Sequence, residues 1–250
     1  MEKVNILGIP FNALTTAETL TLLESWLTTE QNHIIVTPNP EGVMQAKRNP
    51  NFFNALQNAD LRLADGIGIV LAAKLKGKPI HERVRGVDTI YSLFDALNKK
   101  SRTFTAYFLG GKPGIAEIAK VNMETKFKNL KIVGCHHGFF KENSAEEESI
   151  IESINKLKPD ILLICTGMPR AEIWAQKHRN INARLTLCLG GTIDIMSGTV
   201  KLAPPVLRKL GLEWMYRLYK QPSRFVRMLD IPRFVMAALM EDSNAKIKNN

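Results

Sequence analysis

The sequence predicts an α/β protein with a Rossmann-like parallel sheet flanked by helices and a helical C-terminal appendage. Strand-like and helix-like segments alternate through residues 1–195, which is typical of repeated β-α units. Several strand-like segments are almost continuously apolar, as expected when helices cover both faces of a parallel sheet. Strand signals stop after Gly198, so we divide the chain into an α/β catalytic core, residues 1–195, and an appendage, residues 196–250.

The strand-like segments are short and rich in Ile, Leu, Val and aromatic residues. They are residues 5–9, 33–37, 61–64, 103–109, 131–135, 161–165 and 185–189. Helical patterns lie between them, at residues 16–27, 67–75, 89–98, 115–126 and 145–157. In the appendage we expect two helices, at 206–220 and 223–240, because Pro204, Pro205 and Pro222 interrupt helical backbone.

Composition excludes several classes of protein. Apolar residues make up 45% of the 250 residues, so the chain can fold around a substantial core. The three cysteines lack the spacing of a disulfide framework or a structural zinc site, which fits a reducing cytoplasm. We find no secretory signal and no run of 18 apolar residues, and we therefore expect a cytoplasmic protein with no membrane-spanning helix.

The charge of the chain is unevenly distributed. The net charge is +10, and residues 201–233 hold eight basic residues against two acidic ones. A segment this basic is suited to an anionic partner such as phosphate, nucleic acid or a lipid surface. In the first appendage helix, Leu210, Trp214 and Leu218 recur at helical spacing among basic residues. An ordinary surface helix has the same pattern, but the charge excess and the aromatic residues favour a membrane surface.

Asp65 is the leading candidate for chemistry. It follows an apolar strand directly and precedes Gly66, so we expect it at the carboxyl edge of the sheet, where open α/β folds bind ligands. A carboxylate held there can accept a proton from a substrate hydroxyl. The alternative is that Asp65 only caps the helix that begins near Gly66.

Thr37 and Asn39 follow a neighbouring strand and should lie at the same edge as Asp65. A hydroxyl and an amide recognise sugar hydroxyls or a uracil edge by donating and accepting hydrogen bonds. Both residue types also serve as turn and cap residues, which is the alternative interpretation. The run Phe108-Leu-Gly-Gly-Lys-Pro-Gly114 can present backbone N–H groups to a phosphate, and Leu189-Gly-Gly-Thr-Ile-Asp194 adds a second glycine-rich loop with a carboxylate.

Two classes of site receive little support from the motifs. The pair Gly66-Ile-Gly68 has Leu71 where a dinucleotide fingerprint needs its third glycine, which disfavours a nicotinamide-dependent oxidoreductase. There is no Asp-x-Asp motif, and His136 and His137 are adjacent rather than four residues apart, so we predict no metal. A metal-free transferase would have to neutralise a leaving diphosphate with Arg, Lys or backbone dipoles, and the appendage is rich in arginine.

Several motifs together resemble those of the WecG/TagA/CpsF glycosyltransferase family. They occur in the family's order, from about Val4 to Arg233, and they are Thr37-Pro-Asn-Pro-Glu41, Ala64-Asp-Gly66, Glu82-Arg83-Val84, Gly167-x-Pro-Arg170, Asp194 with Gly198, and Glu213-Trp-Met-Tyr-Arg217 with Pro222 and Arg224. The likeness is greatest to the branch that acts in wall teichoic acid synthesis. The chain departs from the family at Ala171, where the family commonly has Gln.

The resemblance implies a reaction and a set of site residues. The reaction is transfer of N-acetylmannosamine from UDP to undecaprenyl-diphosphate-linked N-acetylglucosamine, with inversion, at the inner face of the cell membrane and without a cofactor. Asp65 resembles the proposed general base. The implied substrate-binding residues are Thr37, Asn39, Arg83 and Asp194, and the implied diphosphate-stabilising residues are Arg217, Arg224 and Arg227 of the appendage.

Other functions remain open from the sequence. Another UDP-sugar donor, such as N-acetylmannosaminuronic acid or glucose, would differ by a single pocket contact. The rival classes are a nicotinamide-dependent oxidoreductase and a basic nucleic-acid-binding module, although the second leaves Asp65 and the polar sheet edge unexplained. We expect no nucleic-acid partner, and the sequence leaves a homo-oligomer open.

Overall fold

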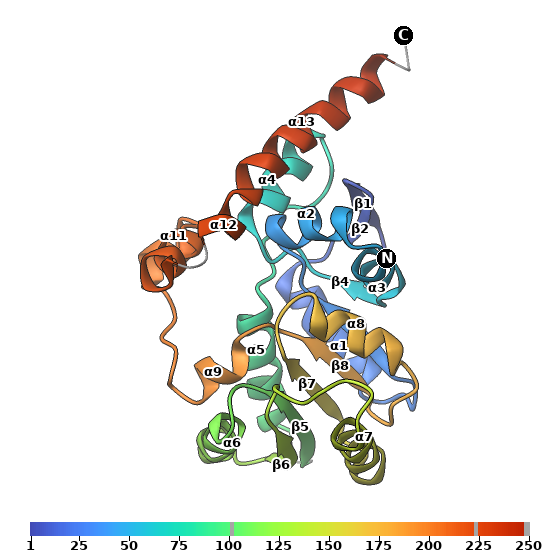
Figure 1. Ribbon diagram of the computed structural model, residues 1–250, viewed down its shortest axis with the longest axis vertical. Helices are drawn as coiled ribbons and strands as arrows, with labels where there is room; N and C mark the ends of the chain where they lie inside the picture. Colours follow the sequence, from blue (N-terminus) through green and yellow to red (C-terminus); the bar gives the residue numbers. More distant parts are fainter. Residues whose placement is uncertain (101–102, 223–224, 248–250) are drawn as a thin grey trace.

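A six-stranded parallel sheet forms the centre of the protein (Figure 1). The computed structural model describes residues 1–100, 103–222 and 225–247. The sheet order is β4-β3-β8-β7-β5-β6. The strands are β3 (His33–Val36), β4 (Leu61–Arg62), β5 (Phe104–Gly110), β6 (Leu130–His136), β7 (Ile161–Cys165) and β8 (Leu185–Cys188). The predicted fold class, a Rossmann-like parallel sheet flanked by helices, is confirmed.

The predicted first strand, residues 5–9, is wrong. This segment contains the turn of an antiparallel hairpin, formed by β1 (Lys3–Ile6) and β2 (Ile9–Asn12), and it stands apart from the parallel sheet. Leu7 and Gly8 make the turn with φ angles of +52° and +88°. Two positive φ angles in a two-residue loop match the twist of a hairpin, and Leu7 is an unusual residue at the first of them.

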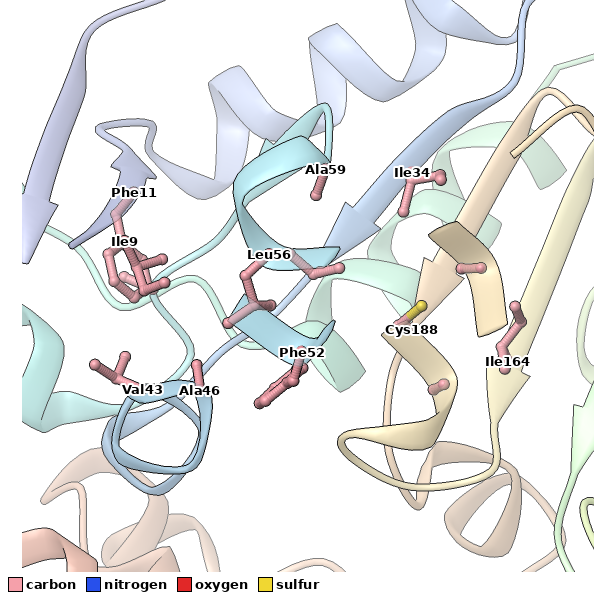
Figure 2. Close-up of a cluster of buried hydrophobic side chains, with 14 of the residues drawn as sticks. Ile9, Phe11, Ile34, Val43, Ala46, Phe52, Leu56, Ala59, Ile164 and Cys188 are labelled. Atoms are coloured by element: carbon pink, nitrogen blue, oxygen red, sulfur yellow. The ribbon is translucent and has the colours of Figure 1, made fainter. Parts of the chain in front are cut away.

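Helices cover both faces of the sheet and bury alternate residues of each strand. On β3, Ile34 and Val36 join one hydrophobic cluster, whereas Ile35 joins the other. Figure 2 shows part of the first cluster, in which Ile34 of β3 is joined by Val43 and Ala46 of α2 and by Phe52 and Leu56 of α3. The core helices are α1 (Thr16–Trp26), α2 (Pro40–Arg48), α3 (Pro50–Asn58), α4 (Ile67–Leu75), α5 (Gly86–Asn98), α6 (Ile115–Lys126), α7 (Ala145–Leu157), α8 (Arg170–Lys177) and α9 (Thr192–Met196).

The sequence patterns did not predict the helices α2 and α3, and Asn39 was weighed only as a turn, cap or binding residue. Each helix has proline at its first position and an asparagine cap before it, which is a favoured start for a helix. The Oδ1 of Asn39 accepts from the Gly42 N–H at 2.9 Å, and Asn49 caps α3 in the same way. Thr37 and Asn39 lie between the carboxyl end of β3 and the start of α2.

In the described residues, the appendage contains four helices rather than the two predicted. They are α10 (Pro205–Lys209), α11 (Glu213–Lys220), α12 (Phe225–Met228) and α13 (Asp230–Ile247). The predicted helix 206–220 is interrupted at Gly211, whose φ is +74°. A Cβ at Gly211 would meet the Ile67 side chain at 3.0 Å, so the break brings the chain directly against α4. The second predicted helix, 223–240, divides between α12 and α13.

The helix α13 is anchored to the core, whereas α11 stands to one side of it (Figure 1). Phe234 and Ala238 of α13 are buried in the first hydrophobic cluster. Asp230 forms an ion pair with Arg48 of α2, and further along α13 Glu241 forms one with Lys76. No side chain of α10, α11 or α12 is buried. Of the helices in the described parts of the chain, none combines the length and the hydropathy needed to cross a bilayer.

Candidate active site

Asp65 lies just past the carboxyl end of β4 and just before α4. The backbone there is fixed, because Leu63 N–H donates to Val36 C=O at 2.9 Å and Val84 N–H donates to Ala64 C=O at 3.1 Å. Gly66, not Asp65, is the N-cap residue of α4, and no side chain caps this helix. The capping alternative for Asp65 is therefore wrong, and its carboxyl is half-buried at the sheet edge.

Charged groups from the core and from the appendage surround the Asp65 carboxyl. Burial raises the pKa of Asp65 to about 6, and Arg217 opposes that shift as the strongest charge acting on it. Glu213 raises the same pKa, Arg83 lowers it and Asp88 raises it. Arg217 and Glu213 belong to α11, so the appendage reaches the sheet edge within one chain. A carboxylate with a pKa near 6 is ionised at neutral pH and remains basic enough to take a proton.

Thr37 and Asn39 approach the same region because two glycines leave room for them. A Cβ at Gly86 would lie 3.1 Å from Cγ2 and 3.3 Å from Oγ1 of Thr37. A Cβ at Gly66 would lie 3.2 Å from Cβ of Asn39. Since Oδ1 of Asn39 caps α2, its Nδ2 is the polar group that can turn toward a ligand while the cap is intact. Thr37, Asn39 and Asp65 are therefore brought to one edge, as predicted.

A network of ion pairs docks the appendage on the core. Arg83 Nη1 lies 3.3 Å from Glu213 Oε2, and Arg83 Nη2 donates to the Arg208 carbonyl at 2.9 Å. Arg208 pairs with Asp88 of α5, and its Nε lies 3.3 Å from Glu213 Oε1. Arg85 pairs with Asp88 and lies 3.8 Å from Glu213. Arg83, predicted to bind substrate, thus makes one contact with the appendage through each of its terminal nitrogens.

The other arginines predicted to stabilise a diphosphate have different surroundings. Arg217 is exposed on α11 and acts on Asp65. Arg227 forms an ion pair with Glu41 of α2, whose carboxylate is nearly buried. Arg224 lies outside the described residues. Of Arg217 and Arg227, the first lowers the pKa of Asp65, whereas the second is paired with Glu41.

Asp194 belongs to a second polar region, formed by glycine-rich loops at the ends of β5, β7 and β8. Gly110, Gly111, Gly167 and Gly190 have φ angles of +156°, +72°, +85° and +48°, so these loops use backbone shapes that favour glycine. Burial raises the pKa of Asp194, and Lys112 of the β5 loop lowers it. Such loops can present backbone N–H groups to phosphate oxygens.

Two polar side chains that the sequence did not single out are buried near these loops. The Thr166 Oγ1 and the Glu172 Oε2 are buried without a hydrogen-bond partner among the described residues. Burial raises the pKa of Glu172 to about 7. Both residues belong to the run Thr166–Trp174, which leads from the end of β7 into α8. Arg170 of that run donates to the carbonyl of Gly138 at 2.6 Å and so holds the loop after β6.

One group of metal-ligating side chains converges in the described part of the chain. The Nε2 atoms of His136 and His137 lie 3.7 Å and 3.6 Å from Glu146 Oε1. The Phe139 N–H donates to His137 Nδ1 at 3.3 Å, which places the His137 proton on Nε2, facing the Glu146 carboxylate. The group lies at the end of β6, the edge strand opposite β4.

The fold and this site define an α/β enzyme with a basic carboxylate and arginines at the carboxyl edge of a parallel sheet, an arrangement suited to transfer from a phosphate-bearing donor. The chain belongs to the glycosyl transferase WecG/TagA/CpsF family, whose sequence profile matches residues 4–248. The resemblance predicted from the motifs is confirmed, and the protein is a glycosyltransferase rather than a nicotinamide-dependent oxidoreductase.

Curated relatives from three bacteria carry one name, N-acetylglucosaminyldiphosphoundecaprenol N-acetyl-beta-D-mannosaminyltransferase. The Bacillus spizizenii protein is 36% identical over 220 residues, covering 87% of this chain and 83% of the relative. The Bacillus subtilis protein is 30% identical over 214 residues, covering 85% and 81%. A Staphylococcus aureus protein is 27% identical over 236 residues, covering 93% and 91%.

Proposed function

We propose that this glycosyltransferase moves N-acetylmannosamine from UDP-N-acetylmannosamine to undecaprenyl-diphosphate-linked N-acetylglucosamine, the linkage unit of a teichoic acid. The names of relatives from three species support the acceptor and the transferred sugar. The observation that carries the mechanism is the placement of Asp65 at the sheet edge, with Arg217 acting on it from the appendage.

Asp65 is the proposed general base. It removes the proton from the attacking hydroxyl of the acceptor sugar as that oxygen bonds to the anomeric carbon of the donor. The bond from that carbon to the UDP oxygen breaks at the same time, so UDP leaves with the electron pair and the configuration inverts. A positioned base contributes about 10²–10⁴-fold to such a step.

Arginine and backbone N–H groups are proposed to stabilise the departing diphosphate. Arg217, Arg224 and Arg227 of the appendage supply positive charge, with the glycine-rich loops of β5, β7 and β8 as the cradle for the nucleotide. Thr37, Asn39, Arg83 and Asp194 are proposed to bind substrate. These groups supply the positive charge that a divalent metal ion supplies in other transferases. We therefore propose that the reaction needs no metal.

The appendage is proposed to hold the enzyme at the inner face of the cell membrane. Its surface combines basic residues with exposed apolar side chains, among them Tyr219, Phe225 and Val226, which are 79%, 59% and 71% exposed. Aromatic and basic side chains together favour a headgroup interface, where each basic residue contributes about 1 kcal/mol near anionic lipid.

The test is a transfer assay with a panel of donors. Purified protein is given a lipid-linked N-acetylglucosamine acceptor and, separately, the UDP forms of N-acetylmannosamine, N-acetylglucosamine, N-acetylmannosaminuronic acid and glucose, each with and without chelator. We expect a disaccharide product with UDP-N-acetylmannosamine, undiminished by chelator. Product formed only from another donor would contradict the proposed donor, and loss of product with chelator would contradict metal independence.

A further inference from the structure

An apolar groove of about 520 Å³ lies between α4 and α13. Its floor is made of small or deeply buried residues, because Gly68 and Ala72 of α4 face Phe234 and Ala238 of α13. The absence of larger side chains at Gly68, Ala72 and Ala238 leaves the space between the two helices unfilled. Groove volumes of about 300–1,000 Å³ are typical of sites for small organic ligands.

The rim of this groove is apolar and exposed. Leu71, Leu75 and Val235 line it and are 52%, 64% and 44% exposed, with Lys74 as the charged residue of the lining. Three large apolar side chains gathered at one groove differ from the scattered apolar residues of an ordinary protein surface. An apolar occupant would remove them from water.

The two walls are fixed relative to each other. Asp230 at the start of α13 pairs with Arg48 of α2, and Glu241 pairs with Lys76 at the end of α4. Glu241 also accepts from the Leu7 N–H at 3.2 Å. Ion pairs thus fix α13 at Asp230 and at Glu241, on either side of the groove. The groove is therefore a stable part of the fold rather than a gap between loosely held helices.

The groove lies along the helix that directly follows Asp65. The helix α4 starts at Ile67, two residues after Asp65, and Gly68 already lines the groove. A Cβ at Gly68 would meet Pro40 Cγ at 2.7 Å and Phe234 Cε1 at 3.8 Å, so glycine permits α2 and α13 to approach here. A molecule with a polar head beside Asp65 can therefore continue along α4 as an apolar chain.

We propose that this groove binds the first isoprene units of the acceptor's polyprenyl chain. The inference rests on the proposed function, which supplies an acceptor with a charged diphosphate-sugar head joined directly to a branched hydrocarbon. Its head matches the polar edge at Asp65 and Arg217, and its chain matches the groove that continues from that edge. The protein would then bind the acceptor on both sides of the diphosphate, through the sugar and through the prenyl chain. A nucleotide sugar has no prenyl chain and would bind poorly in the acceptor position.

Binding of a probe that lacks the sugar tests the groove without requiring sugar transfer. Geranylgeranyl diphosphate, which has four isoprene units, is titrated calorimetrically into the wild type and into Leu71→Glu and Leu75→Glu. Both side chains are exposed, so a carboxylate there is compatible with folding, and circular dichroism checks it. Because each buried methylene contributes about fourfold to affinity and a carboxylate opposes burial, we expect at least about 10-fold weaker binding by each variant.

Transfer to acceptors of different chain length gives the second measurement. The readout is the ratio of kcat/KM for a four-isoprene acceptor to kcat/KM for a one-isoprene acceptor with the same diphosphate-sugar head. We expect the ratio to exceed about 10 in the wild type and to fall toward 1 in Leu71→Glu. Val121→Glu on α6, where Val121 is 62% exposed, is the matched control and should keep the wild-type ratio.

Three results would overturn the groove proposal. The first is an unchanged chain-length ratio and unchanged probe affinity in both glutamate variants. The second is a change of oligomeric state in sedimentation with the ratio retained, which would assign the groove to a second copy of the chain. The third is loss of vesicle binding with the ratio retained, which would assign it to the bilayer. No transfer to any acceptor would instead refute the proposed function, while the probe titration would still decide about the groove.

Discussion

Arg217, on a helix near the end of the chain, is the strongest charged neighbour of Asp65, which lies 152 positions earlier in the sequence. The guanidinium lowers the pKa of the carboxyl against the effect of burial, so the charge state of the candidate base depends on whether α11 is in place. The appendage is therefore part of the electrostatics of the site.

Asp65→Asn should abolish most of the transfer activity. The amide has nearly the shape of the carboxylate but cannot accept the proton, so we expect turnover to fall by about 10²–10⁴-fold. Asp95→Asn, at an exposed carboxylate on α5, is the control and should retain activity. A folded Asp65→Asn protein with near-normal turnover would remove Asp65 from the role of base.

The same substitution should stabilise the protein, and more so at high pH. Asp65 has a folded-state pKa of about 6 against an ordinary value of 3.8. When the pKa of a group is higher in the folded than in the unfolded state, the protonated group stabilises the fold. This contribution is fully present below the unfolded-state pKa and is lost as the pH rises through the folded-state pKa of about 6. Relative to wild type, Asp65→Asn should gain about 1 kcal/mol more in free energy of unfolding at pH 8 than at pH 5. Urea denaturation at both pH values measures it, and an equal difference at both would contradict the raised pKa.

The rate of transfer should fall as the pH drops below about 6. Protonation of Asp65 removes the base, so kcat/KM should decrease about tenfold per pH unit on the acidic side. Arg217→Ala should move this acidic limb to higher pH, because losing the nearby cation raises the pKa of Asp65. A pH profile of both proteins gives the comparison, and an unshifted limb in the variant would show that Arg217 does not act on the base.

Arg217→Ala should also lower turnover more than stability. Removing a donor to developing phosphate charge costs about 10²–10³-fold, whereas an exposed arginine on a helix with no buried side chain contributes little to folding. Arg217→Lys should restore part of the rate, and Lys220→Ala on the same helix is the control. Parallel loss of turnover and thermal stability would indicate a purely structural role.

Arg208→Ala should release α10 and α11 from the core. The change removes the pairs with Asp88 and Glu213, while neighbouring Lys209→Ala is the matched control on the same short helix. We expect faster chymotrypsin cleavage after Trp214 and Tyr219 and a fall in turnover, with little change in the unfolding midpoint of the core. Cleavage as slow as in the control would show that the ion pairs do not hold the appendage.

The parallel sheet could be predicted because its strands are continuously apolar, and a run such as Ile161–Cys165 has few alternatives. The hairpin could not, since Leu7 adopts a positive φ in which leucine is uncommon. The break at Gly211 depends on its approach to Ile67, which no local pattern reveals.

Some features of the candidate site could likewise be predicted from the sequence, and others could not. Asp65, Thr37 and Asn39 follow the ends of apolar strands, so their position at the sheet edge could be predicted from the sequence. The docking network joins Arg208 to Asp88 across 120 positions, and pairings at that distance are set by the fold rather than by spacing. Arg83 and Glu213 both belong to family motifs, but the motifs do not reveal that the two residues form an ion pair.

The segment from α10 to α12 is a strap, because the chain is held at both of its ends. Its ends lie at Ala203 and Asp230, which are both buried, and none of its helices in the described residues buries a side chain. A strap can bow outward but cannot swing away, so its detachment and return are unimolecular events at a high effective concentration. After each detachment the segment from α10 to α12 can therefore rebind quickly, without a slow diffusional search for the core.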